Sequence, residues 1–472
     1  MEQIKNIGFV SLGCPKNQID TEIMLSLLVN AGYEITDDVN ANVIIVNTCA
    51  FTEDAKKEAI DNILDVAWLK DNRLLKGIVV CGCLAERYRE EIFTQIPEVD
   101  AVVGVGSIKN IVEAVRAVGD AHRASRDKYI SLLPKEELKL GGDRVLTAPE
   151  YMAYIKISEG CDNRCSYCAI PDIRGRLRSR KMEDIVEEAQ DLADAGVREL
   201  IVASQDTTSY GADLCTDDRP RSSVNMAQPQ RTTEDGRPYD CEPLPALLRE
   251  LCKIEGFRWI RLLYCYPGRV TDKLIEVIKT ESKIVKYIDL PIQHINGRIL
   301  SAMNRAGGRE AIESCIKKLR DEIPGIVIRT TVIAGFPGET KSEFDELLAF
   351  ANKTGFERLG AFAYSAEEDT PAAKLPGQIT KKAKERRLAA IMSAQERIIF
   401  VFNEKRIGKT EEILCEGFDA VGEIYYGRSA ADAPDIDCKV YFYSDRKVND
   451  GEFVNVRIEE VIDLDVMGRE ER

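Results

Sequence analysis

The 472-residue sequence has no long apolar run, only two histidines and no excess of positive charge. No apolar stretch approaches the roughly 20 residues of a membrane-spanning helix. The first residues lead directly into a strand pattern rather than a signal peptide, so we expect a cytoplasmic protein without a membrane segment. The formal net charge of -15 argues against a general nucleic-acid binder, because such proteins are basic. A local RNA site stays open.

Cysteine, by contrast, is plentiful, with 14 in the chain. Without an export signal, this favours metal ligands and buried thiols over disulfides. Cys161, Cys165 and Cys168 follow the spacing C-x3-C-x2-C, which places three thiolates on one tight loop. Three such thiolates can bind three irons of a [4Fe-4S] cluster and leave the fourth iron open. A zinc knuckle is the alternative, but neither His122 nor His294 is close in sequence to supply a fourth ligand.

This motif, with glycine before the first cysteine and tyrosine before the last, resembles the signature of the radical S-adenosylmethionine (SAM) enzymes. The resemblance implies that SAM binds the open iron of a cluster on Cys161, Cys165 and Cys168.

The first 120 residues alternate buried strand patterns with amphipathic stretches, which predicts an α/β domain with a parallel sheet and helices on both faces. Cys14, Cys49 and Cys83 each follow a predicted strand and lie 35 and 34 positions apart. Carboxyl ends of parallel strands meet at one edge, so the three cysteines should lie together. The pattern alone allows either a second cluster or three buried thiols.

The segments that contain these cysteines resemble the N-terminal domain of the radical SAM methylthiotransferases. They are Leu12-Gly13-Cys14-Pro15-Lys16-Asn17, Asn47-Thr48-Cys49 and Gly82-Cys83-Leu84-Ala85-Glu86-Arg87-Tyr88. The resemblance implies a flavodoxin-like domain over residues 1–120 that carries an auxiliary [4Fe-4S] cluster on Cys14, Cys49 and Cys83. Cys81 has no matching ligand position and is interpreted as a packing residue.

Residues 121–150 have charge clusters and no sustained period, so we expect a connection with His122 as a solvated side chain. Residues 151–379 repeat strand and helix six times. Six units are too few to close an eight-stranded barrel, so an open partial TIM barrel is expected, as the resemblance also implies. Within it, residues 215–245 are polar and contain proline, which predicts a mobile inserted surface loop.

Four residues at predicted strand ends are candidates for the cofactor pocket or the substrate site. Ser204 and Gln205 offer polar groups to the ribose or amino acid part of SAM, and Gly335 permits close backbone approach. A lone histidine at a strand end is usually a structural hydrogen-bonding residue. The string Leu290-Pro291-Ile292-Gln293-His294, however, resembles the protein-modifying branch of the family, which makes His294 a substrate-site candidate.

A basic run lies next to the Cys161 loop and contains Arg174, Arg176, Arg178, Arg180 and Lys181. It is either a solvated face or a contact for the SAM carboxylate or an acidic substrate side chain.

A helix is expected over residues 380–403, followed by short strands over 404–472 that predict a small antiparallel β-barrel similar to the TRAM module of the family. This last segment has 10 Lys and Arg against 18 Asp and Glu. An acidic barrel suits a basic protein rather than a phosphate backbone. The string from Gly427 to Asp437 also resembles the branch that modifies small-subunit ribosomal protein S-twelve.

The resemblance covers the chain except for the insertion. It implies transfer of a methylthio group to the β-carbon of an aspartate in that ribosomal protein, with two [4Fe-4S] clusters and SAM as cofactors. A flavodoxin or ferredoxin would supply the electron, and a sulfur donor system would renew the sulfur. Two alternatives remain: a transfer-RNA adenosine methylthiotransferase, and an iron–sulfur electron carrier or redox sensor. An electron carrier or redox sensor would not need six βα units and a terminal barrel.

Overall fold

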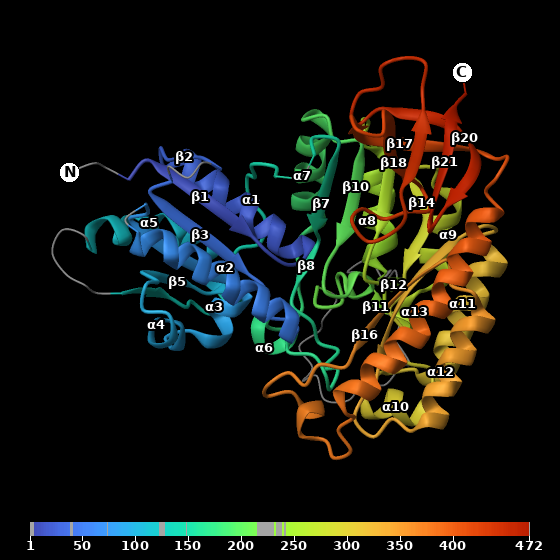
Figure 1. Ribbon diagram of the computed structural model, residues 1–472, viewed down its shortest axis with the longest axis horizontal. Helices are drawn as coiled ribbons and strands as arrows, with labels where there is room; N and C mark the ends of the chain where they lie inside the picture. Colours follow the sequence, from blue (N-terminus) through green and yellow to red (C-terminus); the bar gives the residue numbers. More distant parts are fainter. Residues whose placement is uncertain are drawn as a thin grey trace.

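Two open parallel sheets and one closed barrel follow one another along the chain (Figure 1). The computed structural model describes residues 4–37, 41–72, 74–121, 128–147, 149–214, 231–232, 238–239 and 242–471. The N-terminal sheet is blue to cyan in Figure 1, the central sheet green to orange, and the barrel red. The predicted α/β multidomain class is therefore confirmed.

The N-terminal sheet is parallel, with strand order β2-β1-β3-β4-β5-β6. Its strands are β1 (Asn6–Ser11), β2 (Glu34–Ile35), β3 (Val43–Thr48), β4 (Gly77–Gly82), β5 (Ala101–Val103) and β6 (Tyr129–Ser131). The order of the first five strands is that of flavodoxin-like folds, as predicted. The edge strands β2 and β6 are too short to produce a periodic pattern, so the sequence did not predict them. β6 lies within the expected connection 121–150, which thus contributes a strand to this sheet.

Helices cover both faces of this sheet. On one face, α1 (Pro15–Asn30), η1 (Val105–Asn110) and α5 (Ile111–Ala121) share a buried apolar cluster with the strands. On the other, α2 (Glu53–Asp71), α3 (Cys83–Tyr88) and α4 (Glu91–Gln95) form a second cluster. A short turn, η2 (Lys135–Glu137), follows β6. His122, predicted to be solvated, lies outside the described residues.

The central sheet is also parallel, with strand order β16-β15-β14-β13-β10-β7. Its strands are β7 (Met152–Lys156), β10 (Glu199–Ala203), β13 (Trp259–Leu262), β14 (Ile284–Asp289), β15 (Val327–Ala334) and β16 (Arg358–Ala363). The crossover helices are α7 (Met182–Asp194), α8 (Pro243–Lys253), α9 (Asp272–Thr280), α11 (Gly308–Glu322) and α12 (Lys341–Thr354), and they bury an apolar core with one face of the sheet. This is the expected six-unit partial barrel.

Short elements carry the loops at the carboxyl ends of the central strands. They are the hairpin β8 (Ser158–Glu159) and β9 (Arg178–Ser179), the helices α6 (Ile170–Arg174) and α10 (Gly297–Ala302), and the turns η3 (Thr207–Ser209), η4 (Pro267–Arg269) and η5 (Pro371–Lys374). Within the expected insertion 215–245, the described parts are the pair β11 (Arg231–Thr232) and β12 (Pro238–Tyr239) and the start of α8. The rest of that insertion lies outside the described residues.

The long helix α13 (Lys381–Glu404) leads from the central sheet to the barrel (Figure 1). The barrel is closed in the order β17-β18-β19-β21-β20, which confirms the predicted small barrel. Its pairings are antiparallel as predicted except that between β19 and β21, which is parallel. Its strands are β17 (Thr410–Asp419), β18 (Ile424–Ser429), β19 (Val440–Tyr443), β20 (Phe453–Ile462) and β21 (Asp465–Glu470). In the described part of the chain, no helix is long and apolar enough to cross a bilayer.

The barrel docks onto the central sheet through a buried ionic layer. Arg428 donates to Glu199 over 2.6 Å, and Arg261 donates to the other oxygen of Glu199 over 2.8 Å. Arg358 pairs with Asp432, and the Tyr287 hydroxyl donates to Asp437 over 2.7 Å. The string from Gly427 to Asp437, which the sequence linked to substrate choice, therefore holds the barrel against the sheet.

Candidate functional site

Cys14, Cys49 and Cys83 meet at the carboxyl edge of the N-terminal sheet. Adjacent strands β1, β3 and β4 place Ser11, Asn47 and Cys81 side by side in register. Each cysteine follows that row by two or three residues, and all three are free thiols. Burial raises the pKa of Cys83, and negative charge on Cys49 and Cys14 raises it further, so the three sulfurs lie within electrostatic range of one another. The structure brings this predicted set together.

Two glycines allow these cysteine loops to pack closely. Gly13 has φ +95°, and a Cβ there would lie 2.7 Å from the Cβ of Cys49. Gly82 has φ +86°, and a Cβ would lie 2.3 Å from Asn47 Oδ1. Any side chain at either position would push the cysteine loops apart.

Three polar residues stabilise the same edge of the N-terminal sheet through hydrogen bonds. Asn17 donates to the carbonyl oxygens of Leu12 and Thr48 over 3.0 and 2.8 Å, and Asn47 donates to the Asn17 carbonyl over 2.9 Å. The Thr48 hydroxyl donates to the Cys81 carbonyl over 2.6 Å. All three lie within the cysteine segments, but the sequence pattern indicated no role for them. Only the general rule that buried polar side chains at strand ends need hydrogen-bond partners could have pointed to these residues.

Cys161, Cys165 and Cys168 lie on the loop that follows β8. Gly160 opens this loop with φ +76°, where a Cβ would lie 2.0 Å from the carbonyl oxygen of Arg176. The Cys161 N–H donates to the Gly175 carbonyl over 3.1 Å, and the Cys168 N–H donates to the Cys165 carbonyl over 3.0 Å. The loop is therefore folded tightly on its own backbone.

Neighbouring strand ends hold this loop in place. Asn163 donates to Asp206, just beyond β10, over 2.8 Å. The Ser166 N–H donates to the Met303 carbonyl over 3.0 Å. The half-buried Arg305 places Nη1 3.9 Å from the sulfur of Cys165.

A buried ionic network joins the two cysteine sets. Arg174 donates to Asp20 over 2.9 Å, to Glu159 over 3.1 Å and to the sulfur of Cys83 over 3.6 Å. Lys156 donates to the same two carboxylates over 2.6 and 2.7 Å. Although burial raises the pKa of Glu159, Arg174 and Lys156 hold it well below the usual range. The network thus ties α1 to the segments on either side of the Cys161 loop.

The candidate SAM-binding residues lie in two separate parts of the central domain. Ser204 and Gln205 follow β10 beside the Cys161 loop. Gln205 donates to Glu159 over 2.6 Å, which leaves its Oε1 buried without a protein partner. Gly335 follows β15 with φ +78°, and a Cβ there would lie 2.5 Å from Cγ of Lys384. Packing against α13 therefore already requires glycine at position 335.

His294 is fully buried. Its Nε2 lies 3.3 Å from Glu339 Oε1, and its Nδ1 accepts the Asn296 N–H over 3.0 Å. Both ring nitrogens therefore have neighbours within the protein, as in the structural hydrogen-bonding role that is more common for such a histidine.

The side chains of the basic run differ in burial. Arg174 and Arg180 are buried, and Arg180 pairs with Glu188 over 2.5 Å. Arg176 is 57% exposed and pairs with Asp162. The run is thus neither a single solvated face nor a single anion-binding set.

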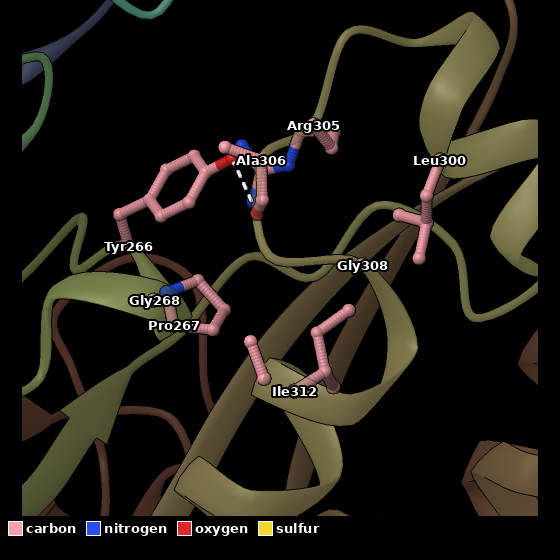
Figure 2. A pocket seen from close by; sticks show the side chains of 9 residues that line it. Tyr266, Pro267, Gly268, Leu300, Arg305, Ala306, Gly308 and Ile312 are labelled. Carbon is pink, nitrogen blue, oxygen red and sulfur yellow. Dashed lines mark hydrogen bonds between the residues drawn. The ribbon is translucent and has the colours of Figure 1, made fainter. Parts of the chain in front are cut away.

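A small cavity of about 10 Å³, enough for one water molecule, lies between the segment after β13 and the segment joining α10 to α11 (Figure 2). The Tyr266 hydroxyl donates to the Ala306 carbonyl over 3.2 Å, and the Arg305 guanidinium stacks on the Tyr266 ring at 4.1 Å. Sites for small-molecule cofactors usually measure about 300–1,000 Å³. This pocket is too small to be the SAM site.

The donor chemistry of both cysteine sets fits iron–sulfur clusters. Although burial raises the pKa of Cys14, Lys16 and Arg174 lower it overall, which favours a thiolate. Burial raises the pKa of Cys83 to about 12 and that of Cys161 to about 11, so these thiols need a cation to ionise. Across the described ranges, no three His, Cys, Asp or Glu side chains converge on one metal position. A [4Fe-4S] cluster does not require that convergence, because each cysteine binds a different iron.

Family models account for all three parts of this architecture. Residues 155–351 match the radical SAM superfamily, residues 6–104 match "Uncharacterized protein family UPF0004", and residues 407–470 match the TRAM domain. The chain is thus a radical SAM enzyme, a class that uses SAM and a [4Fe-4S] cluster.

Similar protein sequences identify the family within the radical SAM enzymes. The chain is 47% identical to the "Ribosomal protein uS12 methylthiotransferase RimO" of Caldanaerobacter subterraneus subsp. tengcongensis, over 98% of this chain and all of the relative. It is 45% identical to the protein of the same name from Clostridioides difficile, over 98% of both chains. The chain belongs to the RimO methylthiotransferase family.

Among solved structures, the chain is similar to TsrM, a radical SAM methyltransferase from Kitasatospora setae. The TM-score is 0.54 at 15% identity, over 78% of this chain and 75% of TsrM. At this identity the likeness supports the fold alone.

Proposed function

We propose that this enzyme transfers a methylthio group to the β-carbon of an aspartate in small-subunit ribosomal protein uS12. Identity of 45–47% over almost the whole chain to relatives named for this activity carries the proposal. Membership in a transferase family sets aside the electron-carrier alternative.

The proposed cofactors are SAM and two [4Fe-4S] clusters. Cys161, Cys165 and Cys168 would hold the cluster that leaves one iron open to SAM, and Cys14, Cys49 and Cys83 would hold the auxiliary cluster. Ser204 and Gln205 would bind SAM, supported by the unpartnered Oε1 of Gln205 beside the Cys161 loop. Gly335 would let the backbone come close to it. When bound, these groups supply a carbon-centred radical, the sulfur atom and the methyl group.

The chain's own residues orient and shield the two sites. Arg174 contacts both Glu159, next to the Cys161 loop, and Cys83 of the N-terminal sheet, so it sets the spacing of the two cysteine sets. Because Arg174 and Glu159 are buried, this junction also excludes water from the space between the sites.

The proposed partners follow from the reaction. A flavodoxin or ferredoxin would supply the electron, and a sulfur donor system would renew the transferred sulfur. A ribosomal protein substrate would place the enzyme in the cytoplasm. His294 remains a candidate for the substrate site only if the buried contact with Glu339 opens when the substrate binds.

The charge of the barrel favours a protein over transfer RNA. From residue 404 to 472, 18 acidic residues outnumber 10 basic ones. Affinity for RNA comes largely from neutralised phosphates, which this barrel is poorly suited to provide. A transfer-RNA adenosine methylthiotransferase is therefore the second candidate.

Mass spectrometry of uS12 from cells with and without the gene tests the proposal. A methylthio addition on an aspartate should disappear from the protein when the gene is deleted. If uS12 is unchanged and a methylthio nucleoside disappears from transfer RNA, the second candidate replaces the first.

A further inference from the structure

Helix α2 presents an apolar stripe to solvent beside its buried face. Ala59, Ile63 and Val66 pack into the N-terminal core. Ile60, Leu64 and Trp68, spaced four residues apart, are 40, 48 and 62% exposed. Residues at i, i+4 and i+8 form a continuous strip on a helix surface. The apolar surface of α2 therefore extends beyond its buried face, and this extension stays exposed among the residues that the structure describes.

Exposed apolar side chains also flank α2 in the sequence. Phe51 precedes α2 and is 42% exposed, and Leu74 follows it and is 55% exposed. Five of the 19 exposed large apolar side chains in the described ranges thus fall between residues 51 and 74. The segment from Ile60 to Trp68 covers about 12 Å of the helix axis. This concentration of exposed apolar side chains in one short part of the chain indicates an interaction surface rather than scattered surface residues.

The strip begins at the edge of the active site. Thr52, the N-cap of α2, lies three residues after the proposed cluster ligand Cys49. The Glu53 N–H contacts the Ser365 hydroxyl oxygen over 3.4 Å, and Lys56 pairs with Glu367 over 3.2 Å. These contacts join α2 to the loop at the carboxyl end of β16. A protein bound along α2 would therefore extend to the space between the two cysteine sets.

Acidic side chains flank the strip. Exposed acidic residues on α2 outnumber exposed basic ones by six to one: they are Glu53, Asp54, Glu58, Asp61, Asp65 and Asp71, against Lys57. A second copy of this chain, an anionic lipid surface or a nucleic acid would meet like charge here. A basic protein would gain both apolar burial and charge complementarity.

We propose that the outer face of α2 is the docking surface for the basic ribosomal protein substrate. This inference rests on the proposed function and extends it, because it assigns substrate recognition to the N-terminal domain as well as to the acidic barrel. Trp68 is the principal contact, since exposed tryptophan contributes most strongly when it is buried in an interface.

Binding of purified uS12 to the cluster-loaded enzyme tests the assignment. The double variant Leu64→Ser/Trp68→Ser removes the centre of the strip, and Phe400→Ser/Val401→Ser on α13 removes two side chains of similar exposure as a matched control. Anaerobic titration of labelled uS12 should show at least a tenfold weaker Kd for the α2 variant and less than a twofold change for the control. SAM cleavage without uS12 should stay at the wild-type rate in both.

A second variant tests the charge argument. Asp61→Lys/Asp65→Lys should weaken binding severalfold at low salt and reduce its salt dependence, because it reverses charge beside the strip. If both α2 variants bind uS12 as tightly as the wild type and still modify it, α2 is not the docking surface. The proposed function would then be unaffected. If the wild-type enzyme binds transfer RNA but not uS12, the proposed function itself fails. A wild-type dimer in sedimentation that Leu64→Ser/Trp68→Ser dissociates would assign the face to a second copy instead.

Discussion

Arg174 Nη2 donates a hydrogen bond to the sulfur of Cys83 over 3.6 Å, and so joins α6 of the central domain to the carboxyl end of β4 in the N-terminal sheet. The same guanidinium contacts Asp20 of α1 and Glu159 of β8. One buried cation therefore stabilises carboxylates from both domains. The relative placement of the two cysteine sets depends on it.

Replacing Arg174 with methionine should destabilise the protein severely. The change leaves Asp20 and Glu159 with only Lys156 as a buried cation, and loss of one partner from such a network costs about 3–5 kcal/mol. Thermal unfolding of the anaerobic enzyme measures the effect. Arg176→Met, which removes an exposed ion pair two residues away, should cost under about 1 kcal/mol. Equal losses in the two variants would contradict the role of the network.

Iron content should separate the two cysteine sets. Cys161→Ala, Cys165→Ala or Cys168→Ala should remove about half of the bound iron and abolish SAM cleavage, since these residues would hold the cluster that binds SAM. Cys14→Ala, Cys49→Ala or Cys83→Ala should remove the other half and spare SAM cleavage, but stop sulfur transfer. Iron analysis with a 5'-deoxyadenosine assay measures both. Unchanged product yield in the second group would exclude the auxiliary cluster.

Cys81 supplies the matched control for that experiment. It is fully buried in β4, two residues before Cys83, and burial raises its pKa well above the ordinary value. Cys81→Ala removes a thiol from the same strand end without removing a proposed ligand. It should keep the full iron content and product yield, and a loss of iron would show that the ligand set is misassigned.

Gly160 should be essential for the cluster on the Cys161 loop. An alanine Cβ would lie 2.0 Å from the Arg176 carbonyl oxygen, in a backbone conformation at φ +76° that L side chains rarely adopt. Gly160→Ala should therefore lose about half of the iron and most SAM cleavage. Gly297→Ala is the control, because a Cβ there meets nothing within 4 Å. Normal iron content in Gly160→Ala would mean that the loop can shift to accept a side chain.

The sequence predicted the parallel N-terminal sheet, the open central barrel and the small terminal barrel, and it placed the cysteines in two groups, because periodicity and motif spacing record local geometry. It could not predict which side chains would point inward. Arg174 and Arg176 look alike in the sequence, yet one is buried in the network and the other is exposed. The string from Gly427 to Asp437 suggested substrate choice, but its charges are neutralised by partners on distant strands. Such pairings depend on long-range contacts that no local pattern records.

The stability that the ionic contact between the barrel and the central sheet contributes should decrease at acidic pH. Burial alone would raise the pKa of Glu199, but Arg428 and Arg261 lower it below the ordinary value. Glu199→Gln leaves two arginines without their carboxylate, so we expect a loss of about 3–5 kcal/mol at neutral pH. A lowered folded-state pKa adds stability above the unfolded pKa, and this contribution is lost as pH falls through the folded value.

The difference in stability between wild type and Glu199→Gln should therefore be constant from pH 7 to about 5. It should shrink below about pH 4.3, the ordinary pKa of glutamate, because the unfolded wild-type carboxyl then takes up a proton while the folded one stays charged. The decrease should end below the folded pKa, where the folded carboxyl is protonated as well. Anaerobic thermal unfolding monitored by circular dichroism across this range measures the difference. The exposed Glu460→Gln control should match wild type throughout. A difference that grows in acid would mean that Glu199 is already protonated in the folded protein, and that the barrel is held against the sheet by the remaining pairs.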